Sequence, residues 1–266
     1  MMGQIGGYFL ASLIGISLGL IGGGGSILTV PVLVYVMGVN ATRATAYSLF
    51  IVGITALVGS LDYCRKRLIS WQAAVVFSLP AFSSVFVVRK YLIPAIPREV
   101  LRVGSFILTK DIFLMVVFAL LMIFASVSMI RDRKNGKEEE VLSLNSPLIG
   151  VTGLLVGGVT GLVGAGGGFM IIPALVNFAH LPMKKAVGTS LLIIATNSLI
   201  GFIGDLMSPT ETIDWNLLIS FSFIACLGIF FGSYLSNFIP GARLKKGFGW
   251  FVAVMALYIL AKEIAG

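Results

Sequence analysis

Charged residues are scarce in this sequence: Asp, Glu, Lys and Arg make up 11% of its 266 residues, whereas 58% are hydrophobic. A soluble domain usually has about 25% charged and about 45–50% apolar residues. Because much of a folded surface must face water, a soluble globule of this size could not bury so much apolar surface. The composition, with a mean hydropathy of +1.02, excludes a soluble enzyme, a nucleic-acid-binding module and a disordered chain. It indicates an integral membrane protein.

Cysteine and histidine are also scarce. Cys64 and Cys226 lie far apart without a CxxC motif, and the single histidine, His180, falls in an expected loop. A reactive thiol pair or a metal site would need ligands grouped at short spacings. The sequence contains neither an HExxH motif nor a GxSxG elbow. We therefore expect no cofactor, no metal site and no enzymatic activity.

The net charge of +8 comes from Lys and Arg residues that lie mostly between hydrophobic segments. This placement is typical of loop charges that orient a membrane protein rather than of a nucleic-acid-binding surface. No ionisable residue is expected at the centre of a helix, since Arg43, Asp62 and Asp205 lie near segment ends. The sequence therefore predicts no proton relay inside the membrane.

Hydropathy predicts an all-α membrane protein with about eight apolar segments, each long enough for a membrane helix of roughly 20 residues. The expected segments are 7–37, 44–61, 72–93, 111–130, 147–178, 186–204, 215–238 and 247–264. One strongly polar linker, 131–146, separates a first membrane repeat, 1–130, from a second, 147–266. The apolar N-terminus lacks the basic residues and cleavage site of a signal peptide, so it is expected to belong to the mature fold.

The two halves resemble each other at a constant offset. The matched residues are Gly19 with Gly161, Gly24-Gly25 with Gly166-Gly167, Pro31 with Pro173, Ala44 with Ala186, and Ser48-Leu49 with Ser190-Leu191. Apolar composition alone would not align glycine, proline and serine in this way. Internal duplication is common in secondary transporters, so the sequence predicts two homologous four-segment repeats.

Glycine runs at 22–25 and 164–168 interrupt the first segment of each repeat. Each glycine costs about 1 kcal/mol relative to alanine inside a helix, so these runs predict breaks followed by half-helices at 26–37 and 168–179. The first N–H groups of a half-helix lack intrahelical partners and carry partial positive charge, so they can bind an oxyanion. The alternative is that the glycines only allow close packing of helices.

The candidate substrate-binding residues are those of the two glycine runs and a polar cluster beside them. They are Gly22, Gly23, Gly24, Gly25, Ser26, Ser48, Gly164, Gly166, Gly167, Gly168, Thr189 and Ser190, with Thr45, Tyr47 and Asn197 as a second tier. The Ser and Thr hydroxyls could instead bond to their own helix backbone.

Two topologies fit the sequence. If the broken segments enter the membrane and return, the repeats are inverted; if they cross it, the repeats are parallel. The inverted arrangement gives the larger excess of basic residues on one face, although the difference does not decide between them. That face would carry Arg65, Lys66, Arg67, Arg131, Arg133, Lys134, Lys137, Lys184, Lys185, Arg243, Lys245 and Lys246. The inverted arrangement is favoured because it brings both breaks to the midplane from opposite sides.

With this duplicated pattern, the chain resembles the TauE/SafE family of sulfite and organosulfonate exporter-like permeases. The second module matches the family pattern more closely, because the first has Tyr47 where the second has Thr189. The resemblance implies a bacterial inner-membrane permease whose partners are a small sulfur-containing anion and the lipid bilayer, with no nucleic acid and with a homo-oligomer left open. Two other functions stay open, a non-transporting membrane scaffold or partner subunit and a passive anion channel.

Overall fold

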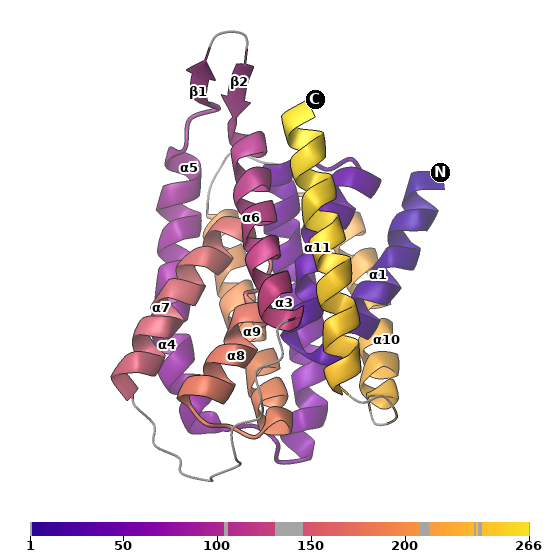
Figure 1. Ribbon diagram of the computed structural model, residues 1–266, viewed down its shortest axis with the longest axis vertical. Helices are drawn as coiled ribbons and strands as arrows, with labels where there is room; N and C mark the ends of the chain where they lie inside the picture. The colour runs from indigo at the N-terminus through magenta and orange to yellow at the C-terminus, as the bar shows by residue number, and fades with distance from the viewer. Residues whose placement is uncertain are drawn as a thin grey trace.

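The computed structural model describes residues 2–103, 106–130, 146–207, 213–236, 238 and 241–265, and in these ranges the chain is mostly helical (Figure 1). The helices of the first half are α1 (Met2–Ile21), α2 (Thr29–Pro31), α3 (Ala41–Arg65), α4 (Trp71–Val87), α5 (Ile93–Ala95) and α6 (Lys110–Ile130). Those of the second half are α7 (Ser146–Val163), α8 (Gly168–Phe178), α9 (Met183–Leu206), α10 (Trp215–Leu235) and α11 (Gly241–Ala265). The expected linker 131–146 lies, apart from its last residue, outside the described ranges.

Five of the described helical stretches are long and apolar enough to cross a membrane. They are Ala41–Arg65, Trp71–Ala95, Lys110–Ile130, Met183–Leu206 and Trp215–Leu235. Large apolar side chains are exposed on the outer helices, among them Phe124 on α6, Phe223 on α10 and Trp250 on α11. A surface of this kind would be unstable in water, and it suits contact with lipid.

A short β-hairpin departs from the expected all-helical fold. Strands β1 (Glu99–Val103) and β2 (Phe106–Thr109) pair antiparallel between α5 and α6. The helix before them ends at Ile96, which is extended (φ −68°, ψ 120°) because it precedes Pro97. β-branched residues such as Val100 and Ile107 then favour strands over helix.

The two glycine-containing segments both break, but they fold differently after the break. In the second half, α7 ends at Val163 and α8 is a regular α-helix. In the first half, the chain continues after Gly22 as a 3₁₀ helix, η1 (Gly23–Leu28), then as α2, and then as a π-helix, η2 (Val32–Val36). The expected regular half-helix at 26–37 is therefore wrong in detail. The π-helical stretch follows Pro31, which has no amide to donate to the helical ladder.

Each broken segment returns to the end of the molecule from which it came. In Figure 1, α1 descends from the upper end and the chain climbs back to the start of α3, whereas α7 rises from the lower end and α8 descends again. Helix α1 runs parallel to α10, with Tyr8 beside Ser220 and Gly15 against the backbone of Ala225. Helix α7 packs in the same way on α4, where Gly157 lies against Ala81.

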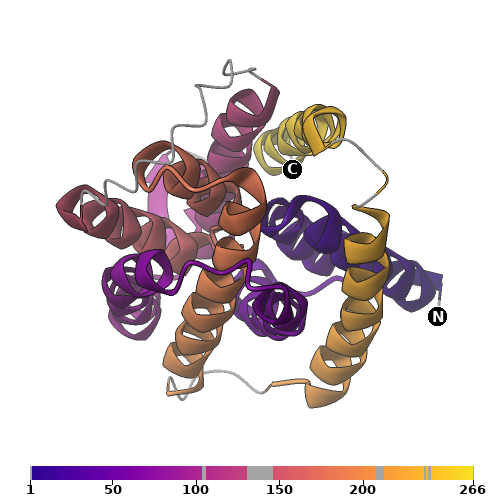
Figure 2. The same cartoon turned by 90° about the horizontal axis from the view of Figure 1, so that it is seen from below.

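Helices α3 and α9 form the centre of the bundle, with the α1–α10 pair on one side and the α4–α7 pair on the other (Figure 2). In the apolar stretches of α3 and α9, 67% and 72% of the residues are buried inside the molecule, against 33–44% in the other three spans. Helices α6 and α11 pack together at the edge of the bundle. The central position of α3 and α9 places their side chains beside both glycine breaks.

Glycine contacts recur at matching positions of the two halves. A Cβ atom added at Gly59 would meet Ile229 and Leu191, and one added at Gly201 would meet Val85 and Leu49. Gly22 likewise contacts Val187 of α9, while Gly164 contacts Thr45 of α3. Close approach at small residues is a usual way to pack membrane helices without a hydrophobic driving force.

Candidate functional site

The two glycine runs meet inside the bundle. A Cβ atom built on Gly23 would overlap the backbone of Gly168, and one built on Gly168 would overlap the backbone of Gly23. Ile194 of α9 lies against the same point, because its Cδ1 atom would be 2.5 Å from a Cβ at Gly23. Two breaks that enter from opposite ends of the molecule therefore touch through bare backbone. We call this contact the glycine crossing.

The second run has a backbone that only glycine adopts readily. Gly164, Gly166 and Gly167 have φ values of +73°, +68° and +68°. Helix α8 begins at Gly168, and the amides of Met170 and Ile171 donate to the Gly167 carbonyl. Its first amides lie at the positive end of the helix dipole and lack intrahelical acceptors. This turn therefore presents backbone donors at a buried position.

Two hydroxyl groups without hydrogen-bond partners lie directly against this turn. The Ser198 Oγ atom would be 3.1 Å from a Cβ at Gly166, and the Thr160 Oγ1 atom overlaps the place that a Cβ at Gly167 would take. Both side chains are buried and make no hydrogen bond. A buried polar group left unpaired costs roughly 1–3 kcal/mol, so an uncompensated pair here is unfavourable unless it serves a ligand.

Ser48 and Asn197 extend this polar cluster. Both are fully buried, and neither the Ser48 hydroxyl nor the Asn197 amide group has a partner. Ser48 is on the α3 face that contacts Gly164 through Thr45, because residues three apart share a helix face. Asn197 adjoins Ser198 and is three residues after Ile194 at the glycine crossing. Two of the sequence-predicted residues thus lie on helix faces that reach the glycine breaks, and their polar atoms have no partner.

The first glycine run leaves fewer polar groups without hydrogen-bond partners than the second run does. The Ser26 hydroxyl donates to the Gly23 carbonyl at 2.8 Å, so it stabilises its own 3₁₀ turn. Gly24 and Gly25 lie inside η1, and Gly25 packs against the backbone of Leu18 in α1. The Thr29 hydroxyl, one residue beyond η1, is buried and unpartnered. Of the two runs, the second offers more free polar groups to a ligand.

The remaining predicted polar residues have hydrogen-bond partners, either at the start of another helix or in their own helix backbone. The Thr189 hydroxyl accepts from the Ser70 amide at 2.9 Å, and the Tyr47 hydroxyl accepts from the Asp214 amide at 2.7 Å. The Ser190 hydroxyl donates to the Val187 carbonyl at 2.8 Å. Thr45 donates in the same way to Thr42, at 2.9 Å. Their hydroxyls are engaged by protein groups, unlike those of Ser48, Thr160 and Ser198.

One arginine near the end of a hydrophobic segment is buried inside the bundle rather than exposed. Arg89 lies in the π-helical stretch η3 (Val88–Leu92) and is only 1% exposed. Its Nη1 atom donates to Thr45 Oγ1 at 3.1 Å and to Asp205 Oδ2 at 3.2 Å. In the sequence, Arg89 precedes Lys90 close to the end of a hydrophobic segment, where basic side chains usually reach toward the interface. Only the fold brings Asp205 beside it.

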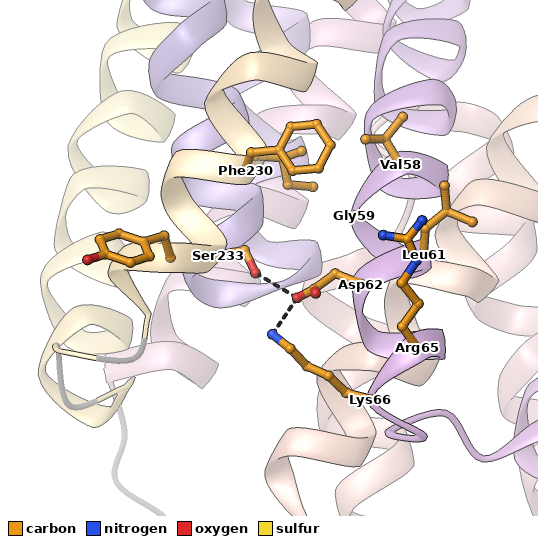
Figure 3. Close-up of a pocket in the computed structure, with 10 residues that line it drawn as sticks. Val58, Gly59, Leu61, Asp62, Arg65, Lys66, Phe230 and Ser233 are labelled. Atoms are coloured by element: carbon orange, nitrogen blue, oxygen red, sulfur yellow. Dashed lines mark hydrogen bonds and ion pairs between the residues drawn. The ribbon is translucent and has the colours of Figure 1, made fainter.

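Two cavities lie at the end of the molecule where α3 ends and α9 begins. The first, of about 330 Å³, is between α3 and α10, and there Asp62 accepts from Lys66 at 2.6 Å and from Ser233 at 3.4 Å (Figure 3). The second, of about 300 Å³, is lined by Arg67, His180 and Lys185 among others. Arg67 and His180 have φ values of +55° and +48°, which are unusual outside glycine.

Within the described parts of the chain, no three His, Cys, Asp or Glu residues come close enough to hold a metal ion. The polar groups against the turn before α8 are the Thr160 and Ser198 hydroxyls and backbone amides, and the Asn197 carboxamide lies one residue from Ser198. These groups donate hydrogen bonds without carrying a full charge. Donors of this kind can bind a small anion without a full positive charge.

Comparisons with known proteins agree with a membrane transporter. The profile of the family "Sulfite exporter TauE/SafE" matches residues 8–259. A protein from Xylella fastidiosa (strain 9a5c), named as a probable membrane transporter protein, is 31% identical over 262 residues, covering 95% of this chain and 93% of the relative. A protein of the same name from Haemophilus influenzae is 25% identical over 271 residues, covering 95% and 96% of the two chains.

An archaeal relative from Methanocaldococcus jannaschii, also named as a probable membrane transporter protein, is 35% identical over 119 residues, or 42% of this chain and 44% of the relative. No solved structure gives a significant match. The family match extends over nearly the whole chain, and the bacterial relatives align over more than nine-tenths of both sequences. This multi-pass membrane protein therefore belongs to the sulfite exporter TauE/SafE family.

Proposed function

We propose that the protein is a secondary permease of the bacterial cytoplasmic membrane that carries small sulfur oxyanions, sulfite or organosulfonates, and binds them at the start of α8. One observation carries this proposal: the buried, unpartnered hydroxyls of Thr160 and Ser198 lie against the left-handed glycines at 166 and 167. The names of the family and of its relatives support a transporter of this class.

The chemistry of the turn favours an oxyanion over a cation or a neutral solute. Backbone amides at a helix N-terminus carry partial positive charge, and hydroxyl and carboxamide groups can turn their hydrogens toward an oxygen. Apolar neighbours such as Val52 and Ile194 keep the local dielectric low, which strengthens each hydrogen bond. Binding without a full positive charge also allows release, which transport requires.

We further propose that the two halves are inverted repeats. Three observations support this: the broken segments return to opposite ends, α1 packs on α10 as α7 packs on α4, and the contacts of Gly59 and Gly201 involve matching residues. Inverted repeats would let the two halves exchange conformations around a site at their interface. The glycine crossing, where Gly23 meets Gly168, is such an interface.

The orientation follows from the loop charges. The lower end in Figure 1 has Arg65, Lys66 and Arg67 after α3 and Lys184-Lys185 at the start of α9. Cytoplasmic loops of membrane proteins carry an excess of Lys and Arg, so we assign this end to the cytoplasm. Both cavities then lie toward the cytoplasmic end of the bundle, where we propose that an anion enters.

Counterflow in proteoliposomes tests the function. Purified protein is reconstituted with unlabelled sulfite inside and ³⁵S-sulfite outside, with methanesulfonate and chloride as competitors. We expect saturable uptake that depends on internal sulfite and is inhibited by methanesulfonate. Uptake that does not saturate and needs no internal anion would indicate a channel. No uptake of any sulfur anion by folded protein would contradict the proposal and favour a scaffold.

A further inference from the structure

We propose that Arg89 forms a second oxyanion site, separate from the glycine crossing, in which the Nε and Nη2 atoms of its guanidinium bind two oxygens of one anion. The ligand class is a small anion with at least two terminal oxygens, such as a sulfonate, sulfite or a carboxylate. This inference rests on the proposed transport of anions only in that an anion must be able to reach the bundle interior.

Only one of the three guanidinium nitrogens of Arg89 makes hydrogen bonds. Nη1 donates to Thr45 Oγ1 and to Asp205 Oδ2, whereas Nε and Nη2 have no hydrogen-bond partner. Nε–H and one Nη2–H point the same way from the planar group and form a two-pronged donor. This geometry matches two oxygens of a carboxylate, phosphate or sulfonate.

The contact with Asp205 leaves the Nε and Nη2 atoms of Arg89 without hydrogen-bond acceptors. The side chain of Arg89 is 0% exposed, while that of Asp205 is 16% exposed, and a single contact of 3.2 Å joins them. Taking a guanidinium out of water is costly unless its other donors also find acceptors. A structural ion pair at this place would be expected to be two-pronged. The observed pair uses only Nη1 and leaves Nε and Nη2 without a hydrogen-bond partner.

The position of Arg89 connects it to the glycine crossing. Its partner Thr45 contacts Gly164, the first residue of the second break. On α9, Asn197, Gly201 and Asp205 are spaced four residues apart and share a face. At a rise of 1.5 Å per residue, Asp205 lies about 12 Å from Asn197 along this face. The guanidinium is therefore a separate site from the glycine crossing. It lies toward the end of the molecule that bears β1 and β2.

The place that corresponds to Arg89 in the other half borders a cavity. Arg89 follows Val85 by four residues, and Val85 contacts Gly201. Ser233 follows Ile229 by four residues, and Ile229 contacts Gly59. Ser233 and Asp62 line the cavity of about 330 Å³ in Figure 3. The chain thus has an open cavity with a serine at one end and a buried guanidinium at the corresponding place at the other end.

Equilibrium binding of ³⁵S-sulfite to the purified full-length protein in detergent tests this site by stoichiometry. We expect two sulfite ions per chain for the wild type and one for Arg89→Lys, since lysine keeps the charge but loses the two-pronged donor. At the Arg89 site, the loss of affinity should be at least tenfold, about 1.4 kcal/mol. The double variant Ser198→Ala/Thr160→Val should lose the other ion and keep the one at Arg89.

Two further variants separate ligand binding from a structural role. Asp205→Asn removes the carboxylate that competes for the guanidinium, so sulfite should bind more tightly at this site. Lys90→Gln, one residue along the same helix, removes a charge whose Nζ lies over the Phe86 ring, and it should leave both sites unchanged. The Asp205→Asn result also keeps the test decisive if Arg89→Lys does not fold.

Every outcome of these binding experiments either supports or overturns the proposed site at Arg89. If Arg89→Lys binds two sulfite ions with wild-type affinity, or if Asp205→Asn leaves sulfite affinity unchanged, the second site does not exist. If the wild type binds one ion that is lost in Arg89→Lys and kept in Ser198→Ala/Thr160→Val, the Arg89 site stands and the proposed site at α8 fails. A single ion with the opposite pattern overturns the Arg89 site alone.

Discussion

The two glycine runs have nearly the same sequence but different structures. In the first, only Gly22 has a positive φ, the chain continues directly as η1, and Ser26 bonds within that turn. In the second, Gly164, Gly166 and Gly167 all have positive φ, and an α-helix begins only at Gly168. Similar sequences can thus differ in backbone geometry. Here the second run provides a turn with free polar groups, and the first run packs against it.

The largest effect is expected at the point where the two runs touch. In Gly23→Ala the new methyl group would overlap the backbone of Gly168, which cannot rotate away as a side chain can. Overpacking costs about 1–3 kcal/mol and sometimes more, and a clash with backbone belongs to the upper part of this range. We expect a large loss of monodisperse protein in size-exclusion chromatography and a lower Tm. Wild-type yield and Tm would show that the runs do not touch.

A second substitution tests the left-handed turn. Gly166→Ala places a Cβ at φ +68° and 2.8 Å from Val52 Cγ1. Strain of this kind costs of order 1–3 kcal/mol, so the turn should adopt another conformation. We expect folded protein with a transport rate at least tenfold below wild type in the counterflow assay. A wild-type rate would contradict the assignment of this turn as the site.

Removing the unpartnered hydroxyls should raise the Tm of the protein and lower its rate of sulfite transport. Ser198→Ala and Thr160→Val each remove a buried group that has no partner. Deleting such a group recovers part of its desolvation penalty of roughly 1–3 kcal/mol, so Tm should rise by a few degrees. Sulfite transport should fall at least several-fold in the same proteins. If Tm falls as well, these hydroxyls serve the fold rather than a ligand.

The smallest effect is expected at Gly24, the control for the comparison. Its added Cβ would lie 3.1 Å from Ile21 Cγ2 and 3.5 Å from Met129 Cε, which are side-chain rather than backbone atoms, and its φ is not positive. We expect Gly24→Ala to transport within about twofold of wild type, which corresponds to less than about 0.5 kcal/mol. If this variant were as inactive as Gly166→Ala, the two runs would contribute alike, and the contrast drawn between them would be wrong.

The sequence predicted the elements that depend on composition and spacing. Hydropathy placed helices at 44–61 and 186–204, where α3 and α9 are found with somewhat longer bounds. The glycine runs correctly predicted breaks, because four adjacent glycines are costly in any helix. The β-hairpin was missed because 99–109 lies between hydrophobic segments, where periodicity carries little signal.

What the sequence could not provide was the pairing of polar groups. Thr189 and Asn197 are equally plausible candidates in the sequence, yet Thr189 accepts from Ser70 and Asn197 has no partner. Thr160 and Ser198 were missed because isolated hydroxyls occur throughout membrane helices. Arg89 was missed because burial at a helix end depends on packing against α9. Whether each of these polar groups is buried or has a hydrogen-bond partner depends on contacts between helices.

Crystals grown in the presence of selenite, an anomalously scattering analogue of sulfite, would locate the anion directly. The expected result is a selenium peak at the start of α8, within hydrogen-bonding distance of the Ser198 and Thr160 hydroxyls and beside Gly166 and Gly167. A peak at Arg89 would accompany it if the second site is present. Peaks only at Arg89, or only in the cavity lined by Arg67 and His180, would contradict binding at the glycine crossing.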